Sequence, residues 1–287
     1  MDGIIVINKP RDWTSMDVCA KLRGVFHEKR VGHAGTLDPM ATGVLPVFVG
    51  QATKAASFAE DGKKEYRASL RLGVVTDTQD TSGTVLSESA VRVTEDELRA
   101  VLPRFTGEIE QIPPMYSAIK VRGKKLYELA RKGVEIERKP RRVTIYELEL
   151  LERDASGDWG LRAVCSKGTY IRTLCHDVGA ALGCGGAMSA LERTMASGFT
   201  IDEAASIEDA QKQGDRLLRP VDSLFRQYPA YRIDYAEAER RCRCGNPIRG
   251  FNIKDGVYRV YGRDGTFLAL SRCEGGVLTS MKNFFST

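Results

Sequence analysis

The chain has 287 residues, of which 42% are hydrophobic and 28% are charged, and its formal net charge is +5. No apolar run approaches the roughly 20 residues of a membrane helix, and the N-terminal IIVI run is shorter than the about 7–15 apolar residues of a signal peptide. These features favour a globular, cytoplasmic protein with one large domain or a large and a small one, and argue against a membrane protein.

The first 50 residues predict a strand, a helix, a loop and a second strand. Residues 3–8, GIIVIN, have the continuous apolar character of a buried strand. Apolar residues recur at helical spacing up to about Phe26 and predict a helix there. Ser15 is expected to cap its start. The glycine-rich segment 32–43 predicts a loop, and the apolar segment 44–49 predicts a strand.

Alternation and capping patterns predict the elements in the middle of the chain. In KKEYRASLRLGV the apolar residues alternate with polar ones, as in a strand with one buried face: Tyr66, Ala68, Leu70, Leu72 and Val74. A capping box of Thr94 and Glu97 predicts the start of a helix. Two strands in a hairpin-like arrangement are expected in VTIYELELLE and WGLRAVCSKG, followed by a helix that ends near Gly183.

The predicted strands outnumber the helices and mostly alternate. This pattern indicates an α+β fold around a mixed, mostly antiparallel sheet flanked by helices, with a further short helix at about 202–212. After about residue 227, short β-like runs separated by glycine and aspartate predict a small β-rich domain. We therefore divide the chain into a large domain, 1–227, and a small domain, 228–287.

Positive charge is concentrated in two zones of the chain. Residues 114–142 hold ten Lys or Arg and three Asp or Glu, and residues 228–287 hold ten and six, so the remainder is acidic. Two basic zones on an acidic body, one of them interleaved with tyrosines, favour a polyanionic partner over a merely solvated face.

The seven cysteines are scattered and odd in number, which is typical of reduced thiols and not of a disulfide framework. The tightest pair, Cys242 and Cys244, has neither the usual Cys-x2-Cys spacing nor the companion histidines of a zinc site. We therefore expect no metal site.

The loop GHAGTLDPMATG, residues 32–43, contains a single carboxylate, Asp38. Asp followed by Pro often starts a helix, because Asp caps the first turn and Pro fits the first helical position. The alternative is a catalytic group. Local chemistry alone favours the helix cap.

A candidate partner for Asp38 lies in CSKGTYIR, where a strand is expected to end and a helix to begin. Arg172 at this junction could pair with Asp38. The pair would lower the pKa of the carboxylate by roughly 1–3 units and keep it ionised as a nucleophile. The alternative is an ordinary surface arginine early in a helix.

Five segments together resemble the TruB-type tRNA pseudouridine synthases in their order and spacing. They are NKPRDWTS, GHAGTLDPMATGVLP, KEYRASLRLG, QIPPMYSAIKVRGKKLYELAR and CSKGTYIRTLCHDVG. The resemblance runs from about Gly3 to Leu191 and extends, more loosely, into the C-terminal region. It implies a pseudouridine synthase fold followed by a small PUA-type domain.

The resemblance implies an enzyme that isomerises uridine 55, in the T-loop of tRNA, to pseudouridine. The uracil is detached from C1′ of the ribose, turned and rejoined through C5, after the base has been flipped out of its stack. The family works without a metal or cofactor, since the reaction has no redox step. The resemblance implies a protein that binds the tRNA T-arm. We expect it to be cytoplasmic, with no membrane and no obligatory protein partner, and nothing in the sequence suggests more than a monomer.

By motif position, the resemblance implies three catalytic residues. Asp38 matches the nucleophile, Tyr66 matches the tyrosine that stacks on the target base, and Arg172 matches the arginine that pairs with the Asp. The sequence leaves open whether the carboxylate attacks C1′, attacks C6 or assists glycal formation.

The resemblance also implies a set of substrate-binding residues. They are Lys9, His33, Asp80, Tyr170, Leu191, Lys124, Lys125, Arg131 and Lys132. The last four belong to the basic segment 114–142, which matches the family's RNA-clasping insertion and is expected to become ordered on RNA. One position departs from the family: Asp12 stands where glycine is usual, so we expect a positive φ there with slight strain.

Two other functions stay open. A guide-RNA-dependent catalytic subunit shares the Asp motif, although the GKKLYELARKG insertion favours an enzyme that grips its substrate directly. An RNA-folding chaperone without catalysis is the second alternative. The joint presence of Asp38, Tyr66 and Arg172 argues against a protein that has lost its activity.

Overall fold

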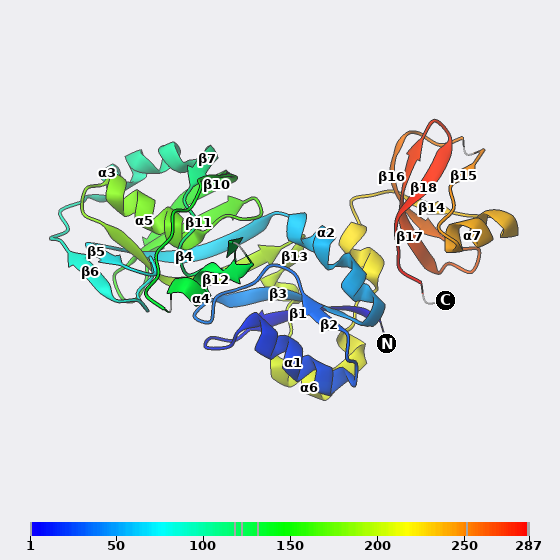
Figure 1. The fold of residues 1–287 in the computed structure, drawn as a ribbon, viewed down its shortest axis with the longest axis horizontal. Coiled ribbons are helices and arrows are strands. Elements are labelled where there is room, and N and C mark those ends of the chain that lie inside the picture. The colour runs from blue at the N-terminus through cyan, green and yellow to red at the C-terminus, as the bar shows by residue number, and fades with distance from the viewer. Residues whose placement is uncertain (1, 118, 122, 131, 251, 286–287) are drawn as a thin grey trace.

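Two β-sheets of unequal size organise the chain (Figure 1). The computed structural model describes residues 2–117, 119–121, 123–130, 132–250 and 252–285. Figure 1 shows the larger sheet with most of the helices around it, and the smaller sheet set apart beside the C-terminus.

The larger sheet has nine strands among the residues described. Seven of them follow one another in the order β1 (Gly3–Lys9), β3 (Thr42–Val49), β12 (Gly186–Ala196), β4 (Lys64–Leu72), β11 (Trp159–Cys165), β10 (Arg141–Arg153) and β7 (Gly107–Gln111). At its margin, β2 (Val31–His33) pairs with β3 and β13 (Phe199–Thr200) pairs with β12. All pairings are antiparallel except that of β3 with β12, which confirms the α+β fold with a mixed, mostly antiparallel sheet.

Strand β1 is buried on both faces, which explains its continuous apolar sequence. Ile5 packs on one side with α1 (Ser15–Phe26) and α6 (Ile207–Gln213). Its neighbour Ile4 faces the opposite cluster, which includes α2 (Ala56–Asp61). Successive side chains of a strand point to opposite faces, so this strand joins two separate cores.

Strand β4 has one buried face, as its alternation predicts. Its apolar residues share a core with α3 (Glu95–Val101) and α5 (Ile171–Ala181): Tyr66, Ala68, Leu70 and Leu72. The strand ends before Val74, because Gly73 follows Leu72 with φ of +82°. Val74 begins a separate hairpin of β5 (Val74–Thr76) and β6 (Val85–Glu88). The prediction that Val74 belongs to the same strand as Tyr66 is therefore wrong.

Thr14, and not Ser15, caps α1. The Thr14 hydroxyl accepts the Asp17 N–H at 3.0 Å, and the Asp17 carboxylate accepts the Thr14 N–H at 2.8 Å. Ser15 is buried and bonds to a neighbouring loop instead, so the predicted cap is wrong by one residue. The capping box predicted at Thr94 is confirmed.

Several short helices complete the larger part of the structure. The helix expected at 202–212 is divided into η3 (Ile201–Glu203) and α6. Other 3₁₀ helices are η1 (Gly50–Ala55), η2 (Leu102–Phe105), η4 (Gly214–Leu217) and η5 (Val221–Phe225). Across the described segments, every helix is too short or too polar to cross a bilayer.

The insertion between β7 and β10 has little regular structure. It contains the hairpin of β8 (Lys120–Val121) and β9 (Lys124–Lys125), followed by α4 (Leu126–Ala130). Leu126 is buried, so α4 is anchored on the protein by its first residue.

The smaller sheet is formed by the C-terminal part of the chain. Its order is β14 (Ala230–Arg232), β16 (Gly256–Tyr261), β17 (Phe267–Glu274), β18 (Val277–Asn283) and β15 (Ile248–Arg249), with α7 (Ala236–Arg243) packed against it. Phe225 of η5 joins this sheet to the larger part, since its ring centroid lies 5.5 Å from that of Phe58 and 5.6 Å from that of Phe284. The β-rich C-terminal region is therefore confirmed.

Substitution of Gly43 tests whether β3, the strand after the Asp38 loop, must approach β12 as closely as it does. Its φ is +99°, and a Cβ there would lie 2.3 Å from the Arg193 carbonyl oxygen. We expect Gly43→Ala to lower the free energy of unfolding by about 2–5 kcal/mol, from backbone strain plus overpacking. Urea denaturation measures this change.

Gly107 supplies the matched control. It has φ of +92°, but a Cβ there would meet nothing within 4 Å. Gly107→Ala should therefore cost only the strain, about 1–2 kcal/mol. Equal losses in the two variants would show that the close approach of Gly43 is unimportant.

Candidate active site

Asp38 lies in a turn and not at the start of a helix. The Ala41 N–H donates to the Asp38 carbonyl at 3.1 Å, and β3 begins at Thr42. The helix-cap interpretation of Asp38 is therefore wrong, and its carboxylate is directed to another partner.

That partner is Arg172, in the first turn of α5. Its Nε lies 3.1 Å from Oδ2 of Asp38, and its Nη1 lies 3.4 Å from Oδ2 of Asp80. Nη1 also donates to the Thr78 carbonyl, and Nη2 donates to the Tyr116 carbonyl at 2.7 Å. Arg172 is only 6% exposed, so the interpretation as a surface arginine is wrong.

The pKa of Asp38 is raised above its usual value, contrary to the expectation from sequence. Although 39% of the Asp38 side chain is exposed, protein surrounds it on the other sides, and this loss of water raises the pKa. The Arg172 guanidinium acts in the opposite direction, and the Asp80 carboxylate adds to the rise. Arg172 therefore limits a rise that burial would otherwise make larger.

Lys9 binds the backbone of the Asp38 loop. It is fully buried, and its ammonium donates to the carbonyls of Pro10, Trp13 and Pro39 at 2.8, 2.6 and 3.2 Å. Burial lowers the pKa of Lys9 to about 8. The Asp12 N–H donates to the same Pro39 carbonyl, and its φ of +65° confirms the positive φ expected there.

Two further buried side chains bind the backbone of this loop. The Ser15 hydroxyl accepts the Leu37 N–H at 2.9 Å, directly before Asp38. Arg193 of β12, which is 1% exposed, donates to the carbonyls of Gly35 and Val44 at 2.8 and 2.7 Å. The loop is therefore held on both sides of its carboxylate.

Tyr66 and Leu191 form part of the apolar surroundings of the loop. Both are 9% exposed and belong to the core that also contains Leu37. Burial raises the pKa of the Tyr66 phenol, and the nearby Asp38 charge adds to the rise. Tyr66 is thus a neutral, buried aromatic ring.

The structure also places Asp80, Lys9, Tyr170 and His33, which the motifs imply as substrate-binding residues. Asp80 and Lys9 interact with the Asp38–Arg172 pair or its loop, as described above, and Tyr170 precedes α5. His33 lies in β2, where burial lowers its pKa and its Nδ1 has no hydrogen-bond partner.

The basic residues of the insertion are only partly placed. Lys132, two positions after the last residue of α4, is exposed. Arg131 and the side chains of Lys124 and Lys125 lie outside what the structure describes.

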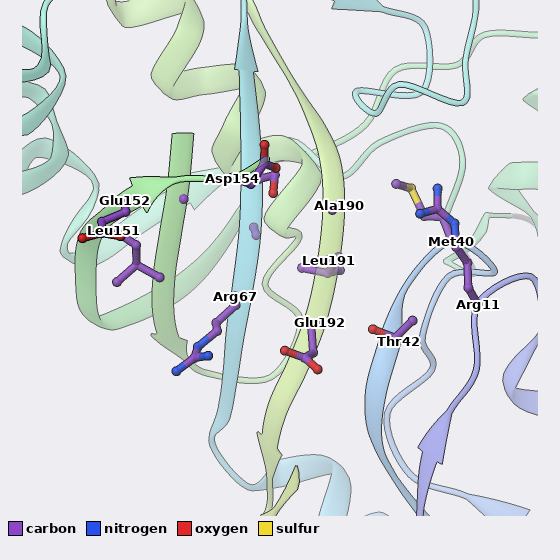
Figure 2. Close-up of a pocket in the computed structure, with 13 residues that line it drawn as sticks. Arg11, Met40, Thr42, Arg67, Leu151, Glu152, Asp154, Ala190, Leu191 and Glu192 are labelled. Carbon is purple, nitrogen blue, oxygen red and sulfur yellow. The ribbon is translucent and has the colours of Figure 1, made fainter. Parts of the chain in front are cut away.

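A depression of about 310 Å³ adjoins the Asp38 loop (Figure 2). Met40 and Leu191 line it, whereas Asp38 does not, so it lies next to the loop and does not include the carboxylate. Figure 2 shows Arg67 and Glu192 on neighbouring strands of this depression, at positions that pair between β4 and β12. Within the part of the chain described, no group of three or more His, Cys, Asp or Glu is placed to hold a metal ion.

Comparison with known families identifies the family of this chain. The profile described as TruB family pseudouridylate synthase (N terminal domain) matches residues 23–171, which include Asp38, Tyr66 and Asp80. The chain belongs to the TruB family. The profile of the tRNA pseudouridylate synthase B C-terminal domain matches residues 172–226, which include Arg172 and Arg193.

Curated TruB relatives match almost the whole chain. The tRNA pseudouridine synthase B of Alkaliphilus oremlandii is 47% identical, over 92% of this chain and 88% of the relative. The protein of the same name from Aromatoleum aromaticum is 43% identical, over 100% and 94%.

Solved structures extend the TruB likeness to the fold. A chain in the crystal structure of a Cbf5-Nop10-Gar1 complex superposes with a TM-score of 0.73 at 25% identity, over 99% of this chain and 85% of that chain. A chain in the structure of an H/ACA RNP bound to a substrate RNA containing 2′-deoxyuridine gives 0.70 at 24%, over 99% and 85%.

Sequence reasoning did not anticipate Arg193, which bonds to the Asp38 loop, or Gln111, which bonds to Tyr170 before Arg172. Arg193 follows Leu191 by two positions in a strand, so a charge on the apolar face was a usable signal. Gln111, whose buried carboxamide bonds to Tyr170, carries no local signal, because its partner lies 59 residues away.

The opposing effects of burial and Arg172 can be measured by titration. We expect the Asp38 carboxyl to titrate above its usual value of 3.8. In Arg172→Gln the midpoint should move to still higher pH, because the charge that favours the ionised form is gone. Carboxyl ¹³C NMR of the aspartate-labelled protein, assigned with Asp38→Asn, measures both midpoints. A midpoint at or below 3.8 in the wild type, or a downward shift in the variant, would contradict this account.

Proposed function

We propose that this protein isomerises uridine 55 in the T-loop of tRNA to pseudouridine, with Asp38 as the nucleophile. The observation that carries the proposal is the 3.1 Å contact between the Arg172 guanidinium and the carboxylate of the GTLDP loop. Membership of the TruB family and relatives named tRNA pseudouridine synthase B support pseudouridylation of tRNA as the activity.

The proposed reaction balances within the nucleoside. The bond between C1′ and N1 breaks and a bond between C1′ and C5 forms, while C5 loses a proton and N1 gains one. Asp38 must be ionised to act as a nucleophile, and the Arg172 charge favours that form. The proposal covers attack at C1′ or C6 and assistance to glycal formation alike.

The apolar surroundings suit a base that has been turned out of its stack. Flipping a nucleotide costs a few kcal/mol, and stacking on an aromatic ring returns about 1–3 kcal/mol per base. In the proposal, Tyr66 supplies that ring and Leu191 packs beside it, since both belong to the core next to Asp38. His33 and Tyr170 complete the nucleotide-binding surface.

Phosphate contacts supply the remaining affinity in the proposal. The basic segment 114–142 and the basic residues of 228–287 would bind the backbone of the tRNA, the latter as a PUA-type domain. The seven cysteines are all free, which supports action in a reducing compartment, the cytoplasm. We propose a monomer that needs no protein partner.

The direct test uses purified protein and an unmodified T-arm stem-loop, without any other RNA or protein. Pseudouridine should appear at the position of uridine 55, and a stem-loop with cytidine there should yield none. Relatives 42–47% identical to this chain are named tRNA pseudouridine synthase B, whereas the chains from the Cbf5-Nop10-Gar1 complex and the H/ACA RNP are 25% and 24% identical. Product only upon addition of a guide RNA would favour the guide-dependent alternative.

Asp38→Asn should abolish product while tRNA binding stays within about tenfold of the wild type, because phosphate contacts carry most of the affinity. Mass-spectrometric detection of pseudouridine and a filter-binding titration measure the two effects. Wild-type-like turnover by this variant would refute the nucleophile assignment.

The insertion is tested by the salt dependence of binding. Replacing Lys124, Lys125, Arg131 and Lys132 by alanine should weaken tRNA binding and reduce the slope of log K against log[salt] by up to about 3–4.

The control for the insertion replaces Lys212 and Arg216, two exposed cations of α6 and η4. Their removal should leave the slope almost unchanged. An unchanged slope in the fourfold variant would remove the insertion from the RNA interface.

A further inference from the structure

Gln111, the last residue of β7, makes an unusual pair of hydrogen bonds. Its Oε1 accepts the Tyr170 N–H at 3.0 Å, and its Nε2 donates to the Tyr170 carbonyl at 3.1 Å. The side-chain amide thus pairs with both backbone groups of one residue, as a neighbouring strand would. Gln111 is 1% exposed, so water does not replace these bonds.

This pairing lies where α5 begins. Tyr170 is the N-cap residue of α5 with extended dihedrals, and its side chain makes no capping bond. At a helix start the first N–H groups have no partner within the helix, whereas the Tyr170 carbonyl already accepts the Leu174 N–H at 3.0 Å. Gln111 supplies a partner for the Tyr170 N–H from another element, and Arg172 follows only two residues later.

The same residue also marks the start of the insertion. Five residues after Gln111, the Tyr116 carbonyl accepts the Nη2 of Arg172 at 2.7 Å. Gln111 therefore links the two segments that meet at Arg172. It is covalently continuous with the insertion that contains Tyr116, and its side chain is hydrogen-bonded to Tyr170 at the start of α5.

We propose that Gln111 is a positioning residue, which sets the place of the Arg172 guanidinium on Asp38 by holding the backbone of Tyr170. It touches neither the carboxylate nor the reacting atoms, and it acts through the first turn of α5. The inference rests on the proposed function for its kinetic readout.

Displacement of Arg172 would change the pH dependence of the reaction, whereas a simple loss of protein stability would not. The charged and titratable groups that face Asp38 are Arg172, Asp80, Lys9, Tyr66 and Tyr170. Arg172 is the strongest of those that favour the ionised carboxylate. If it withdraws, the remaining balance raises the pKa of Asp38, so the acid limb of kcat/KM moves to higher pH.

The experiment compares Gln111→Met with Gln51→Met. Methionine keeps the shape of glutamine and adds no charge, while both bonds to Tyr170 are lost. Gln51 lies in η1, and its Oε1 is buried without a partner, so its replacement controls for loss of a buried amide. Single-turnover rates on the T-arm stem-loop are measured at subsaturating protein, so that they report kcat/KM, across the acid pH range, together with RNA affinity and thermal unfolding.

For Gln111→Met we expect a rate at neutral pH about 10- to 100-fold below wild type, RNA affinity within about threefold, and an acid limb displaced to higher pH. Gln51→Met should match the wild type in all three. If Gln111→Met does not fold, Gln111→Asn keeps an amide one methylene shorter and should show the same displacement in smaller measure.

Two results would overturn this inference while the proposed function stands. They are a wild-type rate in Gln111→Met, and a reduced rate with an unmoved acid limb. Absence of product from the wild-type protein would instead refute the proposed function, and this inference with it.

Discussion

The contact between Asp38 and Arg172 is the interaction on which the site depends. A buried guanidinium is costly unless it is paired and its donors are satisfied, and Arg172 meets this condition with two carboxylates and two carbonyls. Its partners come from three distant segments: Asp38 from the first, Thr78 and Asp80 from the second, and Tyr116 from the third. One charge therefore gathers the GTLDP loop, the β5–β6 hairpin and the start of the insertion around the first turn of α5.

The loop that carries Asp38 is held by its backbone. Lys9 binds the Pro39 carbonyl, Ser15 binds Leu37, and Arg193 binds carbonyls on either side of the turn. These anchors leave the Asp38 carboxylate for Arg172 and for a substrate. Because they are buried cations and a hydroxyl on rigid elements, the loop is organised before a ligand arrives, as a precise catalytic geometry requires.

Burial and charge act in opposite directions on Asp38. Loss of water raises its pKa, while the Arg172 charge favours the ionised form. The Tyr116 carbonyl connects this balance to the insertion, since it bonds to the same guanidinium. Through Gln111 and Tyr116, the segment proposed to grip RNA and the segment proposed to perform chemistry share one arginine.

Local patterns in the sequence determined the strand of Tyr66, the capping box at Thr94, the α+β class and the motif loop of Asp38, because alternation, capping and turns depend on near neighbours. Only the tertiary structure decided that Asp38 caps no helix, that its pKa is raised, that Ser15 bonds to the loop, and that Gln111 and Arg193 bond to the segments that carry Arg172 and Asp38. Burial and hydrogen bonds between segments up to 158 residues apart set these features, and no local pattern encodes such distances.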